Sequence, residues 1–419
     1  MRGTADRVRM RRGFLIAVLA AGLVATGCSG ASSPAGRLPG PAATHATPKP
    51  DSTTTAGPFY QPPAPLPPAR PGTLIRDQGV ITQAGQQAWR ILYHSRGPTG
   101  ADIAVSGIVV APAGAAPVGG RRVIVYGHGT TGIADRCAPS SWSNPLTAII
   151  DSPQLLGAGY VVVATDYPGL GTLGTHPLYV AGGEGRAMLD AARAARSLPG
   201  VGAGAETVVV GYSQGGQAAL AAGAMAATYA PDLHVHGIFA AAPLIDVPAT
   251  LRSMDVSSGP GYTLLAALGV AAIDSRADID TVLTATGRSL ARAATVECSG
   301  TLVEKAAALG FSRIFSADPM TTSPFREDFA AQAAVTERPG MPPLNLVQGT
   351  ADVTVPPPAT AAAVRRLCAL HDTVRYTTYP AADHATVISA SITGMMGWIA
   401  DRFDDRRAPT SCPRSVIAR

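Results

Sequence analysis

The chain has 419 residues, of which 46% are hydrophobic and 15% charged, so it carries enough apolar material for a substantial core. Its formal net charge is +5, but residues 1–27 hold five arginines and one aspartate, a net of +4 that leaves about +1 for the rest. A nearly neutral body does not offer the clustered cations that phosphate backbones require. We therefore expect no nucleic-acid partner.

The amino-terminal residues have the composition of an export signal. An arginine-rich start precedes an apolar run from Phe14 to Ala25, which is too short to span a bilayer as a helix. Arg11 and Arg12 resemble the pair of a twin-arginine signal. Small residues precede Cys28, as in bacterial lipoproteins. We predict a signal peptide over residues 1–27 and a lipid anchor on Cys28 that attaches the chain to a membrane, with plain secretion as the alternative.

The next segment, residues 28–72, is rich in proline, alanine, glycine, serine and threonine. Such a stretch buries too little surface to offset the entropy of ordering it, so we predict a flexible tether. The folded body is expected to occupy residues 73–419, and we favour a monomer.

The body alternates short apolar runs with helical stretches. Ala88–Ser95 and Ile103–Pro112 flank a Gly/Pro turn and predict an antiparallel hairpin. Further strands are predicted at Val123–Tyr126, Tyr160–Thr165, Thr207–Gly211, His236–Pro243, Leu344–Gln348 and Val374–Tyr379, and helices at 145–156, 184–196, 214–229 and about 385–403. Apolar strands that alternate with helices indicate a mostly parallel sheet covered on both faces, an α/β fold with an antiparallel start.

Between Pro243 and Leu344 the alternation stops and only helical patterns remain. An insertion between two strands must lie at one end of the sheet, where ligands bind in such folds. We predict a helical cap over residues 246–335, approximately.

The stretch "VVVGYSQGGQAALAAG" (Val208–Gly223) places a serine between two glycines where a strand gives way to a helix. The Gly-x-Ser-x-Gly pattern alone is weak, but this strand–turn–helix setting is the one that a nucleophile elbow requires. We therefore predict Ser213 as a nucleophile. Gly211 and Gly215 leave room where strand and helix pass closely, and the helix start supplies the N–H of Gln214 as an oxyanion donor.

A serine nucleophile needs a base and an acid that orients it. His384 follows the last predicted strand, where it could swing over Ser213, whereas His176 lies in a loop that could also touch the site. Asp352 follows the preceding strand by four residues and is the predicted acid. The rival acids are Asp246, which follows the strand after the elbow, and Asp383, which is adjacent to His384 and would normally point elsewhere. The order serine, aspartate, histidine is that of α/β-hydrolases.

The second oxyanion donor should come from the loop Gly127–Gly132, after the first parallel strand. We favour the N–H of Thr130, with Thr131 and Gly129 as alternatives. This chemistry needs no cofactor, and no His/Cys cluster has the spacing of a metal site.

Four cysteines remain in the body of an exported chain, which suggests two disulfides and permits three pairings. We favour Cys137 with Cys298 and Cys368 with Cys412. The second pair would tie the last stretch of chain to the body.

Five short motifs appear together in the body: "RCAPS" (136–140), "DYPGLG" (166–171), "GYSQGG" (211–216), "GTADVTVP" (349–356) and "DHAT" (383–386). With them the chain, from roughly Pro71 to Phe403, resembles the secretory lipase family of α/β-hydrolases, typified by fungal lipase A. The resemblance implies fatty-acyl ester substrates, a helical cap that shapes an acyl tunnel, and two disulfides, and it supports the favoured pairings. Fungal members have a longer carboxyl tail that helps cover the site, and we expect that flap to be absent here.

The main hypothesis is a serine ester hydrolase, a lipase or carboxylesterase, that works through an acyl-enzyme on Ser213. One alternative is an acyltransferase that passes the same acyl group to an alcohol other than water. The other is a catalytically inert lipid-binding envelope lipoprotein.

Overall fold

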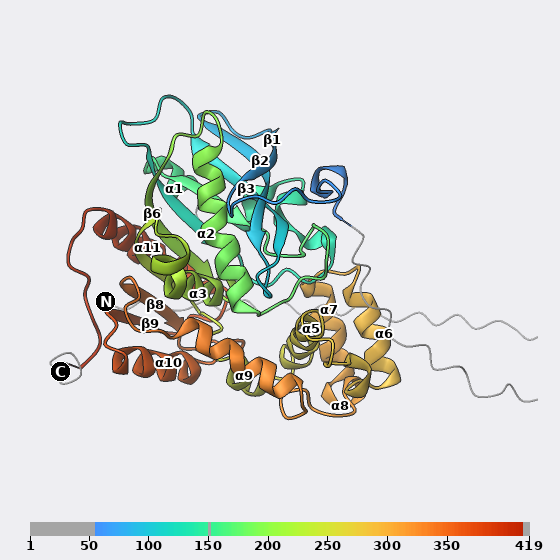
Figure 1. The fold of residues 1–419 in the computed structure, drawn as a ribbon. Coiled ribbons are helices and arrows are strands. Elements are labelled where there is room, and N and C mark those ends of the chain that lie inside the picture. Colours follow the sequence, from blue (N-terminus) through green and yellow to red (C-terminus); the bar gives the residue numbers. More distant parts are fainter. Residues whose placement is uncertain (1–54, 150–151, 414–419) are drawn as a thin grey trace, which may run out of the picture. The chain divides into compact units, whose positions relative to one another are not determined.

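The computed structural model describes residues 55–149 and 152–413, and their fold is drawn in Figure 1. Nine strands form one sheet in the order β1-β2-β3-β5-β4-β6-β7-β8-β9. The strands are β1 Leu74–Val80, β2 Gln86–Arg96, β3 Asp102–Pro112, β4 Arg121–Gly127, β5 Val161–Thr165, β6 Ala203–Tyr212, β7 His234–Ala241, β8 Leu344–Gly349 and β9 Val374–Tyr379. The pairs from β1 through β3 to β5 are antiparallel, and all pairs from β5 to β9 are parallel.

Helices cover both faces of the parallel strands. They are α1 Ser152–Gly157, α2 Ala181–Ser197, α3 Gln214–Tyr229, α10 Pro357–Ala369 and α11 Thr386–Phe403. Val123 and Val125 of β4 pack in one buried cluster with alanines of α2 and α3, whereas Ile124 and Tyr126 pack in another with residues of α1 and α11. Side chains alternate along a strand, so a continuously apolar strand requires a helical layer on each side.

A group of helices without any strand lies between β7 and β8 in the part of the chain that the structure describes. It contains α4 Val247–Ser253, α5 Gly259–Ala271, η5 Ile279–Thr281, α6 Ala285–Ala294, α7 Ser299–Leu309, α8 Phe311–Ile314 and α9 Phe325–Thr336. We call residues 247–336 the cap; its helices α5–α8 gather beside the sheet (Figure 1). The cap has its own apolar cluster, which includes Leu264, Leu302 and Phe325 and reaches Ile133 and Tyr179 of the body.

The segment before β1 corrects the predicted boundary of the tether. From residue 55 onward the chain packs on the body: the Ala56 N–H donates to the Gly171 carbonyl at 2.9 Å, and the buried Tyr60 bonds the Ser140 hydroxyl at 3.0 Å. The guanidinium of Arg90 also lies over the Tyr60 ring. An aromatic anchor of this kind provides burial that the average composition of residues 28–72 conceals. Residues 1–54, with the predicted signal peptide, Cys28 and most of the tether, lie outside the described residues.

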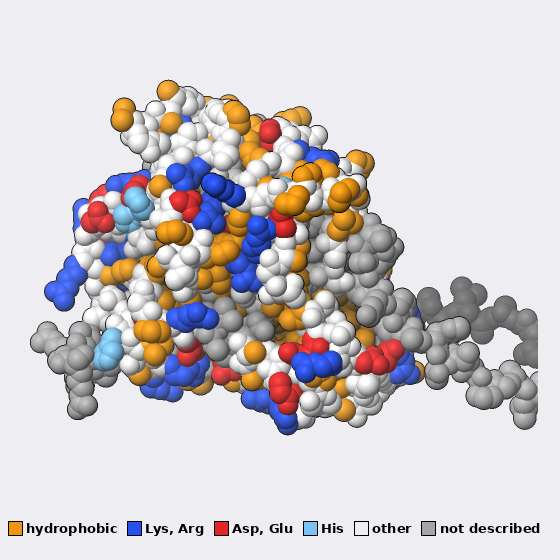
Figure 2. Space-filling model, in the orientation of Figure 1, with side chains coloured by type: hydrophobic (Ala, Val, Ile, Leu, Met, Phe, Trp, Pro, Cys, Tyr) orange, Lys and Arg blue, Asp and Glu red, His pale blue; other side chains and the backbone are white. Residues whose placement is uncertain are grey.

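Other elements differ from the sequence-based expectation. The predicted helix over 145–156 is a 3₁₀ turn at Pro145–Ala148 followed by the short helix α1. Strand β1 and helix α10 were not predicted at all. None of the described helices is long and apolar enough to cross a membrane. On the face shown in Figure 2, basic side chains are scattered among acidic and hydrophobic ones.

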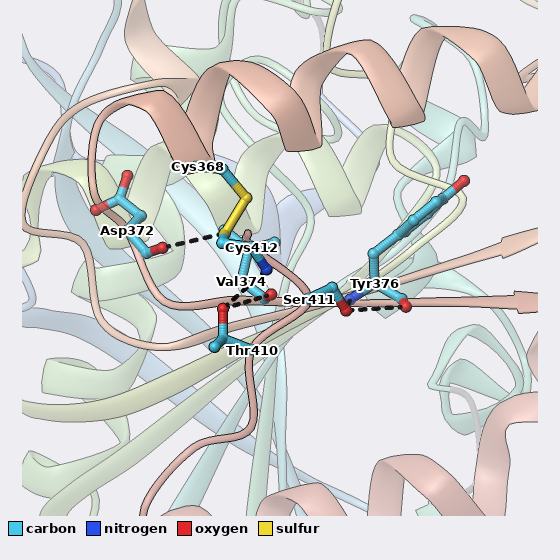
Figure 3. Close-up of a disulfide and its surroundings, with 7 residues drawn as sticks. All are labelled: Cys368, Asp372, Val374, Tyr376, Thr410, Ser411 and Cys412. Carbon is cyan, nitrogen blue, oxygen red and sulfur yellow. Dashed lines mark hydrogen bonds between the residues drawn. A yellow bond between two sulfur atoms is a disulfide. The ribbon is translucent and has the colours of Figure 1, made fainter. Parts of the chain in front are cut away.

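Two disulfides are present, Cys137–Cys298 and Cys368–Cys412, which are the favoured pairings. The second one holds the carboxyl-terminal segment against β9, the last strand of the sheet (Figure 3). The N–H of Ser411 donates to the Val374 carbonyl at 2.7 Å, and the Ser411 hydroxyl accepts from the Tyr376 N–H at 3.0 Å. This segment satisfies backbone groups that an uncovered edge strand would leave free to pair with another chain.

Candidate active site

Ser213 stands on a strained turn between β6 and α3. Its backbone has φ +57° and ψ −117°, and its N–H donates to the Ala241 carbonyl of β7 at 2.9 Å. A Cβ on Gly211 would lie 1.9 Å from the Gly215 carbonyl oxygen, and a Cβ on Gly215 would lie 1.9 Å from that of Gly127. Both glycines are therefore required by close backbone contacts, as the sequence predicts. Such a turn raises a serine hydroxyl above the carboxyl end of the sheet.

The structure brings Ser213, His384 and Asp352 together. The Nε2 atom of His384 lies 3.0 Å from the Ser213 hydroxyl, and its Nδ1 atom lies 2.8 Å from Asp352 Oδ2. A carboxylate can only accept, so Nδ1 carries the proton and Nε2 is free to accept from the hydroxyl. The three residues follow β6, β9 and β8, whose carboxyl ends meet at one edge of the sheet.

The rival acids are occupied elsewhere. Asp246 accepts the N–H of Ala249 and caps α4, and the carboxylate of Asp383 accepts from the N–H and hydroxyl of Thr386. No described contact joins either carboxylate to the imidazole of His384.

Asp352 is buried and fully hydrogen bonded. Its Oδ1 accepts from the N–H groups of Thr354 and Val355 at 2.9 and 2.8 Å, and its Oδ2 also accepts from Gln348 Nε2 at 2.8 Å. These donors fix the direction of the carboxylate and thereby that of the His384 ring. Sequence reasoning missed Gln348; its position at the end of β8, four residues before Asp352, was the available signal.

The loop Gly127–Gly132 passes beside Ser213. A Cβ on Gly129 would stand 3.6 Å from the Cβ of Ser213. Among the described groups, none accepts a hydrogen bond from the backbone N–H of Thr130 or of Gln214. Two amide donors without a described acceptor thus lie one residue from Ser213 and one residue from Gly129, which approaches Ser213, and two such donors are what an oxyanion requires.

A buried polar layer lies beneath the turn and was also missed from the sequence. The side-chain amide of Gln214 donates to Glu184 Oε1 at 2.8 Å and to His176 Nε2 at 3.0 Å, while His176 Nδ1 donates to the Pro168 carbonyl. Burial raises the pKa of Glu184 to about 8 and lowers the pKa of His176 to about 3, so both are neutral near pH 7. His176 therefore holds the Gln214 side chain and does not contact the Ser213 hydroxyl. The signal for Glu184 was an acidic residue at the start of an alanine-rich helix.

No group of three or more metal-binding side chains occurs in residues 55–149 and 152–413. The arrangement can deliver a proton from a hydroxyl to an imidazole and stabilise a developing negative charge, as acyl transfer to serine requires.

Residues 147–410 match the model of a protein family described as secretory lipase, and this is well over half of the chain. The chain belongs to the secretory lipase family. This secretory lipase is a carboxylic ester hydrolase of the serine type and an exported protein. Neither acyl transfer to another alcohol nor an inert lipid-binding role finds support in these matches.

Two fungal relatives span most of the secretory lipase chain. It is 26% identical over 393 residues to the secreted triacylglycerol lipase LIP7 of Malassezia globosa, covering 86% of this chain and 81% of that protein. It is 24% identical over 388 residues to lipase A of Moesziomyces aphidis, covering 86% of this chain and 82% of that protein.

The closed-state structure of Candida antarctica lipase A matches with a TM-score of 0.74 at 22% identity, covering 88% of this chain and 89% of that one. The predicted α/β-hydrolase fold is thereby confirmed.

Proposed function

We propose that Ser213 is the nucleophile of ester hydrolysis, His384 its general base and acid, and Asp352 the residue that orients and stabilises the imidazole. The observation that carries this proposal is the uninterrupted hydrogen-bond chain from Ser213 through His384 to Asp352. The N–H groups of Gln214 and Thr130 are the oxyanion donors. Their location beside the hydroxyl and their lack of another described acceptor support this role.

The reaction follows from this geometry in two halves. Ser213 Oγ attacks the acyl carbon while its proton passes to His384 Nε2, and the carbonyl oxygen becomes an oxyanion held by the two N–H groups. The ester C–O bond then breaks, and His384 gives the proton to the leaving alcohol. In the second half, water replaces the alcohol: His384 takes its proton, the hydroxide attacks the acyl-enzyme, and the acid leaves as Ser213 regains its proton.

The test of the proposed nucleophile is Ser213→Ala. Hydrolysis of a soluble p-nitrophenyl ester should fall by a factor on the order of 10⁶ with an unchanged melting temperature, because Ser213 supplies the only hydroxyl among the described residues that contacts His384 Nε2. A fluorophosphonate probe should label the wild-type protein and leave the variant unlabelled. Activity retained by the folded variant would refute the assignment.

Fatty-acyl esters are the proposed substrates. A cavity of about 300 Å³ in the cap is lined mainly by apolar side chains, among them Leu251, Met254, Phe311 and Met320. It adjoins the acid loop, because Asp255, which lines it, donates its N–H to the carbonyl of the residue after Asp352, at 3.4 Å. An apolar cavity of this size beside the acid loop suits a hydrocarbon chain.

Two alanines on α7 provide a matched test of this substrate class. Ala307 lines the cavity, and its neighbour Ala308 is exposed and does not. Ala307→Phe should shift the preferred acyl chain to shorter lengths, whereas Ala308→Phe should leave the chain-length profile unchanged. An identical chain-length profile for both variants would show that this cavity does not bind the acyl chain.

A lipid anchor on Cys28 is the proposed means of attachment to the cell envelope. The small residues before Cys28 support it. Cys28→Ser should release the enzyme from the membrane fraction into the medium and abolish incorporation of a labelled fatty acid. Unchanged fractionation would favour plain secretion.

A further inference from the structure

Four consecutive carbonyl groups of the loop beside Ser213 each accept a hydrogen bond. The pairs are Tyr167 Oη to the His128 carbonyl (2.9 Å), His128 Nδ1 to the Gly129 carbonyl (2.7 Å), Ser299 Oγ to the Thr130 carbonyl (2.9 Å) and Ser299 N to the Thr131 carbonyl (2.8 Å). The first two donors belong to the body. The last two belong to one residue of the cap, at the start of α7.

These bonds fix the backbone on both sides of Thr130. A peptide unit is planar, so a held carbonyl also fixes the N–H of the next residue. The His128 side chain holds the peptide that carries the Thr130 N–H, and the Ser299 hydroxyl holds the peptide that follows it. With both neighbouring peptide planes held, the Thr130 N–H has a defined direction.

Ser299 is itself held firmly in place. It is 9% exposed and follows Cys298, which is bonded to Cys137 and forms an isolated antiparallel bridge with Gly132. A Cβ on Gly132 would lie 3.1 Å from the Ser299 nitrogen and 3.2 Å from the Cys137 sulfur, so the two segments are in direct contact. The Thr130 carbonyl is the only partner that the described residues give to the Ser299 hydroxyl.

We propose that Ser299 is a positioning residue for catalysis: its hydroxyl extends from the cap to the Thr130 carbonyl and keeps the oxyanion donor of the body in its productive orientation. This inference rests on the proposed function, because it assigns a role to the Thr130 N–H. The hydroxyl touches neither the substrate nor the reacting atoms. The cap would then set the turnover rate as well as enclose the acyl chain.

The test compares Ser299→Ala and Ser299→Thr with Ser289→Ala, a control on the neighbouring cap helix α6. Among the described residues, the exposed Ser289 hydroxyl contacts only Ala285 and Arg292 of its own helix. Ser299→Ala should lower kcat for a soluble p-nitrophenyl ester about 10-fold, less than the roughly 10²–10³ that loss of an oxyanion donor costs. KM should change less than about twofold, since the ground-state ester does not use the donor fully. Ser299→Thr, which keeps the hydroxyl, should restore kcat, and Ser289→Ala should behave as wild type.

A trifluoromethyl ketone, whose adduct on the nucleophile carries an oxyanion, gives a second measurement. Its inhibition constant should rise by the same factor as kcat falls in Ser299→Ala. Ser299→Cys serves if the alanine variant does not fold, because the thiol keeps the volume and donates weakly. A folded variant without the hydroxyl that retains wild-type kcat and inhibitor affinity would overturn the inference, and so would equal losses in Ser299→Thr.

The outcome is separable from the proposed function. If Ser213→Ala is inactive and Ser299→Ala is fully active, only the positioning role fails. If Ser213→Ala keeps its activity, the proposed function fails whatever Ser299 does.

Discussion

The loop beside Ser213 and the edge of β9 are each secured by one disulfide, but the two bonds have different surroundings. Cys298 precedes Ser299, which contacts the carbonyls beside the proposed oxyanion donor. Cys412 follows Ser411, which pairs with the beginning of β9, whereas His384 follows the end of that strand. One disulfide thus supports the loop that carries the proposed oxyanion donor, and the other supports the edge of the sheet. Changes in the first region should alter rate, and changes in the second should alter stability.

After Ser213→Ala, the largest effect is expected from Asp352→Asn, which alters the carboxylate that contacts His384. An asparagine amide in this position favours the wrong tautomer of His384, so kcat should fall by about 10⁴-fold while the melting temperature changes little. Asp246→Asn is the matched control, because it alters the rival acid that caps α4. Steady-state kinetics should separate the two, and equal losses in both variants would return the choice of acid to question.

Removal of the Cys137–Cys298 disulfide should affect both rate and stability. The double variant Cys137→Ser/Cys298→Ser opens a link between residues 161 positions apart, and such a loss typically costs about 2–4 kcal/mol in the free energy of unfolding. It should also lower kcat about as much as Ser299→Ala, because Ser299 loses its neighbour's anchor. Denaturant titration and kinetics check the two effects. A stable variant with unchanged kcat would show that the contacts of Ser299 suffice alone.

Removal of the Cys368–Cys412 disulfide should affect stability alone. The bond joins residues 44 positions apart, so Cys368→Ser/Cys412→Ser should lose slightly less free energy of unfolding than the first pair. Its kcat should match the wild type, and light scattering on mild heating should rise because the edge of β9 is freed. A fall in kcat at a temperature where the variant is folded would contradict the contrast between the two regions.

The last prediction concerns the pH dependence of stability and the polar layer under the turn. Burial raises the pKa of Glu184 to about 8, above its ordinary value, so the folded state binds a proton that the unfolded state has released. This contribution to stability is complete below about pH 4.5 and is lost as pH rises toward 8. Glu184→Gln should remove that slope, and the melting temperature of wild type should fall more steeply than that of the variant between pH 5 and 9. Parallel curves would mean that Glu184 does not carry the proton.

His176 acts in the opposite direction, since burial lowers its pKa to about 3 from 6.5. Its contribution is present above about pH 6.5 and is lost as pH falls toward 3, where the unfolded state binds the extra proton. The two windows overlap between about pH 4.5 and 6.5, where the slopes have opposite signs, so the Glu184 slope is read between about pH 6.5 and 8 and the His176 slope between about pH 3 and 4.5.

Much of this architecture could be predicted because it is encoded locally. The strand–turn–helix pattern around Ser213 and the strand ends before Asp352 and His384 determine which side chains share one edge of the sheet. Strand β1 could not be predicted from the sequence because its residues are half-buried or exposed at the sheet edge and show no apolar alternation. Helix α10 was not predicted because it begins with prolines, which also mark loops. Proline is nevertheless well tolerated in the first turn of a helix.

The missed parts of the site are tertiary. Ser299 and Thr130 are 169 residues apart in the sequence, and Glu184 and Gln214 are 30 residues apart, so no short sequence pattern predicts either contact. The contact between Tyr60 and Ser140 is likewise between residues far apart in the sequence. For this reason the composition of residues 28–72 predicted a start of the folded body that was too late. Burial of a polar side chain depends on what folds over it, and only the assembled chain supplies that information.

The junction between Cys298–Ser299 and the loop of Gly132 has a consequence for protein engineering. Exchanging a cap is an attractive way to change which acyl chains an enzyme accepts, but here this junction alone joins the cap to the body by two hydrogen bonds and a covalent bond. A transplanted cap would need to bring a thiol and a hydroxyl at these two neighbouring positions. Without these two residues, a change of cap intended to alter acyl-chain selectivity would also lower kcat.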